Sequence, residues 1–140
     1  SAACFADEPR VFTLSVHAAS NFPLRKVSSD VDIPLADGTS DEDYLQTIGD
    51  RLPELLDTIQ PGLVIYNAGV DPHRDDRLGR LSLSDQGLLM RDHLVLDACL
   101  RRNIPVATVI GGGYDELSPL VMRHALIVRA ALEQARLHGL

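Results

Sequence analysis

Several potential metal ligands lie in a polar loop that follows the apolar run at residues 63–66. They include Asp71, His73, Asp75 and Asp76. Zinc takes carboxylate oxygens and imidazole nitrogens at about 2 Å, and a strand end holds such groups without help from a flexible loop. The loop is therefore a candidate metal site. The alternative is a solvated acidic turn in which Asp71 caps local backbone, because aspartate is common in turns.

A second candidate feature is the glycine run at residues 111–113 and the tyrosine that follows it, Tyr114. Three glycines let the backbone turn tightly and approach a ligand closely. The Tyr114 phenol could donate a hydrogen bond to the oxyanion of a tetrahedral intermediate, as amide hydrolysis requires. The alternative is a glycine turn with a packing tyrosine. A phosphate-binding loop is disfavoured, because the spacing fits neither a dinucleotide fingerprint nor a P-loop and no lysine follows.

Short apolar and β-branched runs predict the strands that carry these loops. Residues 63–66 and 105–110 have the pattern of parallel strands covered on both faces. Residues 10–16 also indicate a buried strand, and residues 31–35 are a further candidate.

Helices are expected at residues 41–59, 85–102 and 119–139. Ser40, Ser84 and Ser118 provide the N-caps, and the first turn of the first helix is acidic. Pro53 is expected to kink that helix or to split it in two.

Strands and helices alternate along the chain, which predicts an α/β fold with a mainly parallel sheet. Ligands in such sheets bind beyond the carboxyl ends of the strands. The loops after Val16, Tyr66 and Ile110 are therefore expected to form the site, and they include both candidate features.

Composition and charge restrict the partners of this chain. Its 140 residues are 45% hydrophobic, as in a soluble single domain. The net charge of −7 disfavours binding to nucleic acid. No apolar run is long enough to cross a bilayer and no signal peptide is evident, so we expect a cytoplasmic protein without a membrane partner. Cys4 and Cys99 are too few for a disulfide framework and are expected to be reduced.

Five stretches together resemble the histone deacetylase superfamily, most closely its class IV branch. They are VFTLSVH at 11–17, NFPLRK at 21–26, SDVDIPLADGTSDEDYL at 29–45, VIYNAGVDPHRDDRLGRLSLS at 64–84 and GGGYD at 111–115. They occur in the family's order over nearly the whole chain. The resemblance implies a three-layer α/β/α fold of the arginase/deacetylase type. It also implies a zinc-dependent hydrolase that removes an acetyl or other acyl group from lysine or a related amine.

The resemblance assigns catalytic roles to two residues of this sequence. Asp71 would be a zinc ligand, and Tyr114 would polarise the acyl carbonyl together with the metal. His73 has no role in the family pattern.

The resemblance also implies binding roles around the metal. Phe22, Gly112 and Gly113 would line the channel that receives the acylated lysine or amine. Ser15 and the main-chain carbonyl of Val16 would hold a potassium ion beneath the zinc.

The sequence departs from the family pattern in the rest of the catalytic centre. It has no adjacent histidine pair to act as general base and acid, and its only Asp-x-His is the discounted residues 71–73. We therefore expect the chain to be the C-terminal part of a single deacetylase domain, metal-free and inactive without the N-terminal part. The alternative is a non-catalytic remnant that associates with a partner chain.

Overall fold

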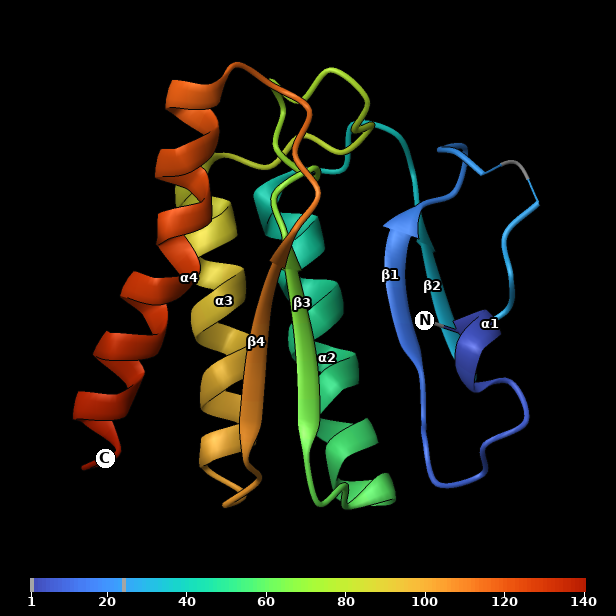
Figure 1. Ribbon diagram of the computed structural model, residues 1–140, viewed down its shortest axis with the longest axis vertical. Helices are drawn as coiled ribbons and strands as arrows, with labels where there is room; N and C mark the ends of the chain where they lie inside the picture. The colour runs from blue at the N-terminus through green and yellow to red at the C-terminus, as the bar shows by residue number, and fades with distance from the viewer. Residues whose placement is uncertain (1, 24) are drawn as a thin grey trace.

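The computed structural model describes residues 2–23 and 25–140 and has the predicted α/β architecture (Figure 1). Both pairs of strands are parallel. In chain order the elements are α1 (Ala2–Phe5), β1 (Leu14–Ala18), β2 (Val31–Leu35), α2 (Asp41–Ile59), β3 (Val64–Gly69), α3 (Asp85–Leu100), β4 (Val106–Gly111) and α4 (Leu117–Leu137).

The four strands form two separate two-stranded sheets within the described part of the chain. Strand β1 pairs with β2, and β3 pairs with β4. In the second sheet Val64 lies opposite Val106 and Gly69 lies opposite Gly111, so β3 and β4 end at the same edge. The loops that follow β1, β3 and β4 consequently lie at one end of the molecule, the upper end in Figure 1.

Helix α2 is continuous, so of the two outcomes expected at Pro53, a kink or a split, the split is wrong. The Ser40 side chain accepts a hydrogen bond from the Asp43 N–H, as expected of an N-cap. The buried side chains of the helix, which include Leu52 directly before the proline and Leu56 three residues after it, belong to the main hydrophobic core. This packing on both sides of Pro53 holds the helix together across the missing backbone hydrogen bond.

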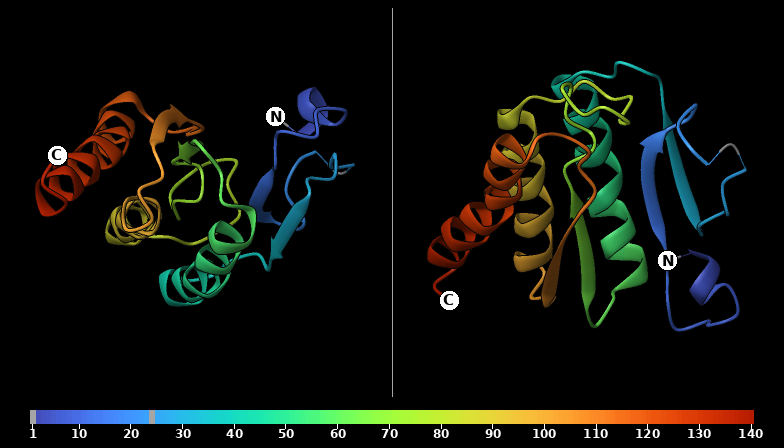
Figure 2. Two further views of the ribbon diagram at one scale, coloured as in Figure 1. Left: turned by 90° about the horizontal axis from the view of Figure 1, so that it is seen from below. Right: turned by 45° about the horizontal axis from the view of Figure 1, so that its top comes forward.

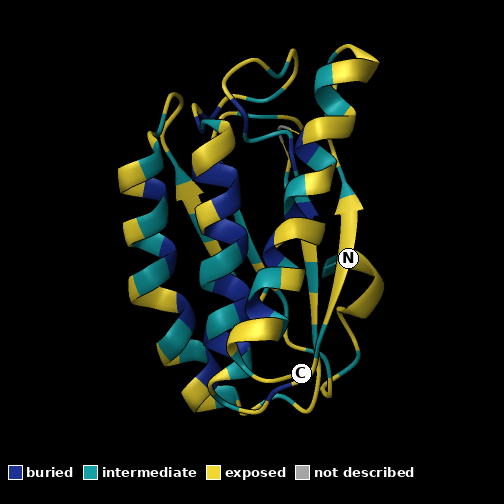
Figure 3. Cartoon of the chain, turned by 90° about the vertical axis from the view of Figure 1, so that its left-hand side faces the viewer, coloured by how far each residue is buried: buried dark blue, intermediate teal, exposed yellow. Residues whose placement is uncertain are grey.

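Helix α3 is the most deeply buried element, as the dark stripe along it in Figure 3 shows. It packs between α2 and α4. The Ser84 hydroxyl caps it by accepting a 3.0 Å hydrogen bond from the Gly87 N–H. Leu88 and Cys99 are fully buried in the main core, and Cys99 is reduced.

The prediction that β3 and β4 are covered on both faces is wrong for the described residues. Figure 2 shows α2 and α3 together on one side of the β3–β4 sheet. Tyr66 and Ala68 point toward that side and pack in the core. On the other side Ile65 is 70% exposed and Val109 is 48% exposed, because no described helix covers them.

Several element boundaries differ from the sequence prediction. Strand β1 begins at Leu14, four residues later than expected. Helix α4 begins at Leu117 with Glu116 as its N-cap residue, so Ser118 lies inside the first turn. None of the helices in the described residues is long and apolar enough to cross a membrane.

Candidate active site

The Asp71 carboxylate lies against the glycine run that follows β4. The Val70 N–H donates a 3.1 Å hydrogen bond to the Gly111 carbonyl, which continues the β3–β4 pairing beyond the strand ends. A Cβ atom added at Gly112 would overlap Asp71 Oδ1, and one added at Gly69 would lie 2.8 Å from it. Gly112 has a φ of +61°, which side-chain-bearing residues rarely adopt. Glycine at position 112 is therefore required by the backbone and by the neighbouring carboxylate.

Burial raises the pKa of the Asp71 carboxyl above its ordinary value. The nearby Asp76 carboxylate raises this pKa further, whereas Arg91 opposes the shift. The local field thus disfavours a bare anion at Asp71. A cation placed at this carboxylate would offset the cost, and this is the electrostatic character of a metal-ligand position.

Arg91 supports the strand end beneath Asp71 and was not identified from the sequence. It is a buried residue of α3 whose Nη1 donates a 2.7 Å hydrogen bond to the carbonyl of Gly69. Its Nε and Nη2 atoms donate to Asp92 Oδ1 at 3.0 and 2.8 Å, and the Tyr66 hydroxyl donates to the same oxygen at 2.6 Å. The buried guanidinium is therefore paired, and it fixes the last residue of β3 on α3.

The loop that carries Asp71 also holds the backbone of Tyr114. Asp76 Oδ2 accepts a 2.7 Å hydrogen bond from the Tyr114 N–H, and the Arg77 N–H donates to the Tyr114 carbonyl at 3.4 Å. Asp76 Oδ1 in turn accepts hydrogen bonds from the N–H groups of Leu78 and Gly79. The two loops selected from the sequence are thus joined, and Asp76 was missed as the residue that joins them.

Tyr114 is 53% exposed within the described part of the chain. The backbone is fixed while the phenol stays accessible, an arrangement suited to a hydrogen-bond donor for a bound substrate.

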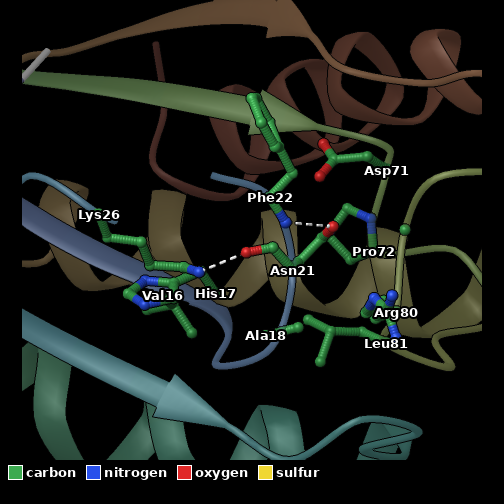
Figure 4. A pocket seen from close by; sticks show the side chains of 11 residues that line it. Val16, His17, Ala18, Asn21, Phe22, Lys26, Asp71, Pro72, Arg80 and Leu81 are labelled. Atoms are coloured by element: carbon green, nitrogen blue, oxygen red, sulfur yellow. Dashed lines mark hydrogen bonds between the residues drawn. The ribbon is translucent and has the colours of Figure 1, made fainter. Parts of the chain in front are cut away.

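A small pocket lies between the loop after β1 and the loop after β3. Figure 4 shows Phe22 and Asp71 among the residues that line it. Phe22 is 87% exposed, and its N–H donates a 2.7 Å hydrogen bond to Asn21 Oδ1. The Lys26 ammonium donates to the carbonyls of Ala19, Asn21 and Pro23 and so fixes the loop on which Phe22 stands.

Ser15 and Val16 both lie on β1. The Ser15 hydroxyl is 2.9 Å from Nδ1 of His17, and Val16 packs against the main core. Val16 and His17 also line the pocket that contains Asp71. The β1 strand therefore approaches the loop after β3 near its carboxyl end.

The described residues do not by themselves form a complete metal site. A catalytic zinc ion takes three protein ligands. Within residues 2–23 and 25–140, no group of three or more His, Cys, Asp or Glu side chains lies close enough together to hold a metal ion. Asp71 fits one ligand position by chemistry and burial, and the other ligands would have to come from elsewhere.

Comparison with known proteins yields one family. Residues 1–129 match the family described as Histone deacetylase domain. An uncharacterized protein of Picosynechococcus sp. is 49% identical over 128 residues, which is 91% of this chain and 43% of that protein. Histone deacetylase 2 of Arabidopsis thaliana is 31% identical over 93% of this chain and 35% of its own length. Histone deacetylase HDAC1 of Drosophila melanogaster is 31% identical over 79% of this chain and 22% of its own length. The chain thus spans less than half the length of these relatives.

Proposed function

We propose, because the chain belongs to the histone deacetylase family, that it forms part of a zinc-dependent hydrolase that removes acetyl groups from lysine or a related amine. The single observation that supports this most is the junction of two loops at one sheet edge. Asp71 lies on the first loop and Tyr114 on the second, and the Asp76 carboxylate bonds the second loop to the first. A metal ligand and an oxyanion donor are thereby held by one connected piece of backbone.

Asp71 would contribute one carboxylate oxygen to the zinc ion. A bound zinc supplies two things, activation of a water molecule and polarisation of the acyl oxygen. The remaining ligands and the general base would come from outside these 140 residues, and the relatives are long enough to contain them. On this proposal the chain is the C-terminal part of one deacetylase domain.

Tyr114 would donate its hydroxyl hydrogen to the acyl oxygen as negative charge develops there. The exposure of the ring and the fixed backbone both favour this role. Such a donor stabilises the transition state more than the substrate, so it acts on turnover.

Phe22 would form one wall of the channel for the acylated side chain, with Gly112 and Gly113 on the opposite loop. The exposed Phe22 ring and the Asp71 carboxylate border the same pocket, which favours an apolar chain leading to the metal ligand. Asp71 occupies the space that a side chain at Gly112 would need, and Leu120 and Val70 occupy the space at Gly113, so both positions require glycine. Ser15 and the Val16 carbonyl would hold a potassium ion on the neighbouring strand.

The alternative is a non-catalytic deacetylase-like chain that associates with a partner. The two separate sheets favour it, because β1 and β3 each have a strand partner on only one edge within the described residues. The exposed apolar side chains Ile65 and Val109 on one sheet face add to this surface.

The decisive experiment is an assay of acetate release by the purified full-length protein. An acetyl-lysine peptide and an N-acetylated diamine serve as substrates, before and after removal of metal with a chelator and after readdition of zinc. We expect turnover that is lost on chelation and restored by zinc. A well-folded, zinc-loaded protein that hydrolyses neither substrate would contradict the enzymatic proposal and favour the non-catalytic one.

A further inference from the structure

Arg123 of α4 is a buried cation that faces three carboxylates. Its side chain is 9% exposed. Nη1 lies 2.6 Å from Asp115 Oδ2, Nη2 lies 3.1 Å from Asp75 Oδ2, and Nε lies 3.4 Å from Asp85 Oδ1. One guanidinium with several N–H donors can bind all three partners at once.

The three carboxylates belong to three different segments of the chain. Asp75 is in the loop after β3, four residues beyond Asp71. Asp85 is in the first turn of α3, and Asp115 directly follows Tyr114 in sequence. These segments meet α4 at the end of the molecule where β3 and β4 finish (Figure 1). Arg123 therefore connects the metal-ligand loop, the tyrosine loop and two helices.

His73, in the loop after β3, also contacts two of these three carboxylate residues, Asp75 and Asp85. Its side chain is 3% exposed, and its Nδ1 accepts a 3.1 Å hydrogen bond from the Asp75 N–H. Nε2 then carries the hydrogen and can donate it to Asp85 Oδ1, at 3.2 Å. Asp85 is thus shared between His73 and Arg123, and the loop after β3 is attached to α3 at the same point.

We propose that Arg123 is a positioning residue for Tyr114, an inference that rests on the function proposed above. The backbone of Tyr114 is held on one side by the Asp76 carboxylate and on the other by the Asp115–Arg123 pair. Arg123 also binds Asp75 in the loop that carries Asp76. It therefore sets the distance between the Tyr114 phenol and the metal-ligand loop without touching substrate.

A double-mutant cycle in the full-length protein tests this inference. Arg123→Gln removes the cation and Asp115→Asn removes only the link to the tyrosine loop, so the second variant serves if the first does not fold. We expect either variant to lower kcat by about 100-fold, the cost of misplacing a catalytic group by about 1 Å, with little change in KM. In the Tyr114→Phe background the same substitution should change kcat by no more than about twofold, because the group that it positions is already absent.

Arg129→Gln is the matched control. Arg129 is on the same helix, its side chain is 62% exposed, and it pairs only with Glu133 one turn away among the contacts described. The Arg129→Gln variant loses the same positive charge as Arg123→Gln and should keep a normal kcat. Equal losses of kcat from Arg123→Gln with and without the Tyr114 hydroxyl would mean that Arg123 supports the fold alone, and would overturn the positioning role.

Amide hydrogen exchange provides a readout that does not depend on turnover, for the case that the Tyr114→Phe background is too slow to assay. Peptides covering residues 112–118 should exchange about 10-fold faster in Arg123→Gln and Asp115→Asn, while peptides from α3 keep their protection. Unchanged exchange at 112–118, or faster exchange throughout, would overturn the inference. If Tyr114→Phe by itself keeps normal turnover, the oxyanion role of Tyr114 fails instead, and this result is distinct from the others.

Discussion

The Asp71 carboxylate occupies the space that a side chain at Gly112 would need. The two residues come from different loops and are brought together by the parallel pairing of β3 and β4. The proposed metal-ligand position and a glycine of the tyrosine loop are therefore one structural unit, and substitution of the glycine should displace the carboxylate.

Gly112→Ala should displace Asp71 and reduce zinc content and turnover together in the full-length protein. Gly38→Ala is the matched control, because Gly38 also has a positive φ of +74° but has nothing within 4 Å of its added Cβ. Both variants should lose about 1–2 kcal/mol through backbone strain. Metal analysis should distinguish the two variants, because only Gly112→Ala should lose zinc. Equal zinc contents in the two variants would show that the side chain at position 112 does not displace Asp71.

Tyr114→Phe should keep zinc content and melting temperature while turnover falls. The ring remains and only the hydroxyl is lost, and removal of one oxyanion donor costs about 100- to 1000-fold in kcat. The Michaelis constant should move little, because the donor acts in the transition state. Near-normal turnover of the Phe variant would leave Tyr114 as a packing residue.

The isolated 140-residue chain should bind zinc weakly or not at all. It offers Asp71 as a ligand, whereas a tetrahedral zinc site needs three protein ligands. Equilibrium dialysis against buffered zinc, followed by metal analysis, measures this directly. Stoichiometric tight zinc on the pure chain would show that the ligand set proposed here is wrong.

Asp115→Asn should destabilise the protein at neutral pH and matter less in acid. Hydrogen bonding from the Glu116 N–H and from Arg123 lowers the pKa of the Asp115 carboxyl below its ordinary value. Its contribution to stability is present above the unfolded pKa of about 3.9 and is lost as the pH falls through the lower folded value. The difference in melting temperature between wild type and variant should therefore shrink as the pH is lowered from 7 to below 4. A difference in melting temperature that does not change with pH would show that the Asp115–Arg123 ion pair does not stabilise the protein.

Local signals were enough to predict most of the elements and both site loops. Ser40 and Ser84 cap helices as expected, and the order of strands and helices predicted the parallel pairing that brings Asp71 to the glycine run. These features depend on neighbours in sequence, or on the rule that parallel strands end at one edge, and a single sequence contains that information.

Two of the failed predictions, at Pro53 and at the β3–β4 sheet, concern tertiary packing. Pro53 stays within one helix because core contacts on either side of it outweigh the local cost. The continuous apolar runs of β3 and β4 predicted cover on both faces, yet Ile65 and Val109 are exposed. Hydrophobicity alone shows that a strand can be buried, and it does not show which segment covers it.

Arg91 and Arg123 were missed because the contacts that join them to the end of β3 and to the loop after it involve residues far away in sequence. Arg91 reaches Gly69 and Arg123 reaches Asp75, so neither pairing leaves a local pattern. One signal was present. Each arginine directly follows three apolar residues of its helix, and a buried arginine in such a place requires a partner.

The proposal that Asp71 is a metal ligand is tested by the zinc content of Asp71→Ala in the full-length protein. The variant should fold, because the local field already disfavours the Asp71 anion when no cation is bound. Asp50→Ala, at an exposed position of α2, is the control and should keep wild-type zinc and turnover. We predict that Asp71→Ala loses both bound zinc and acetate release. Wild-type zinc content and turnover in that variant would show that Asp71 is not a zinc ligand.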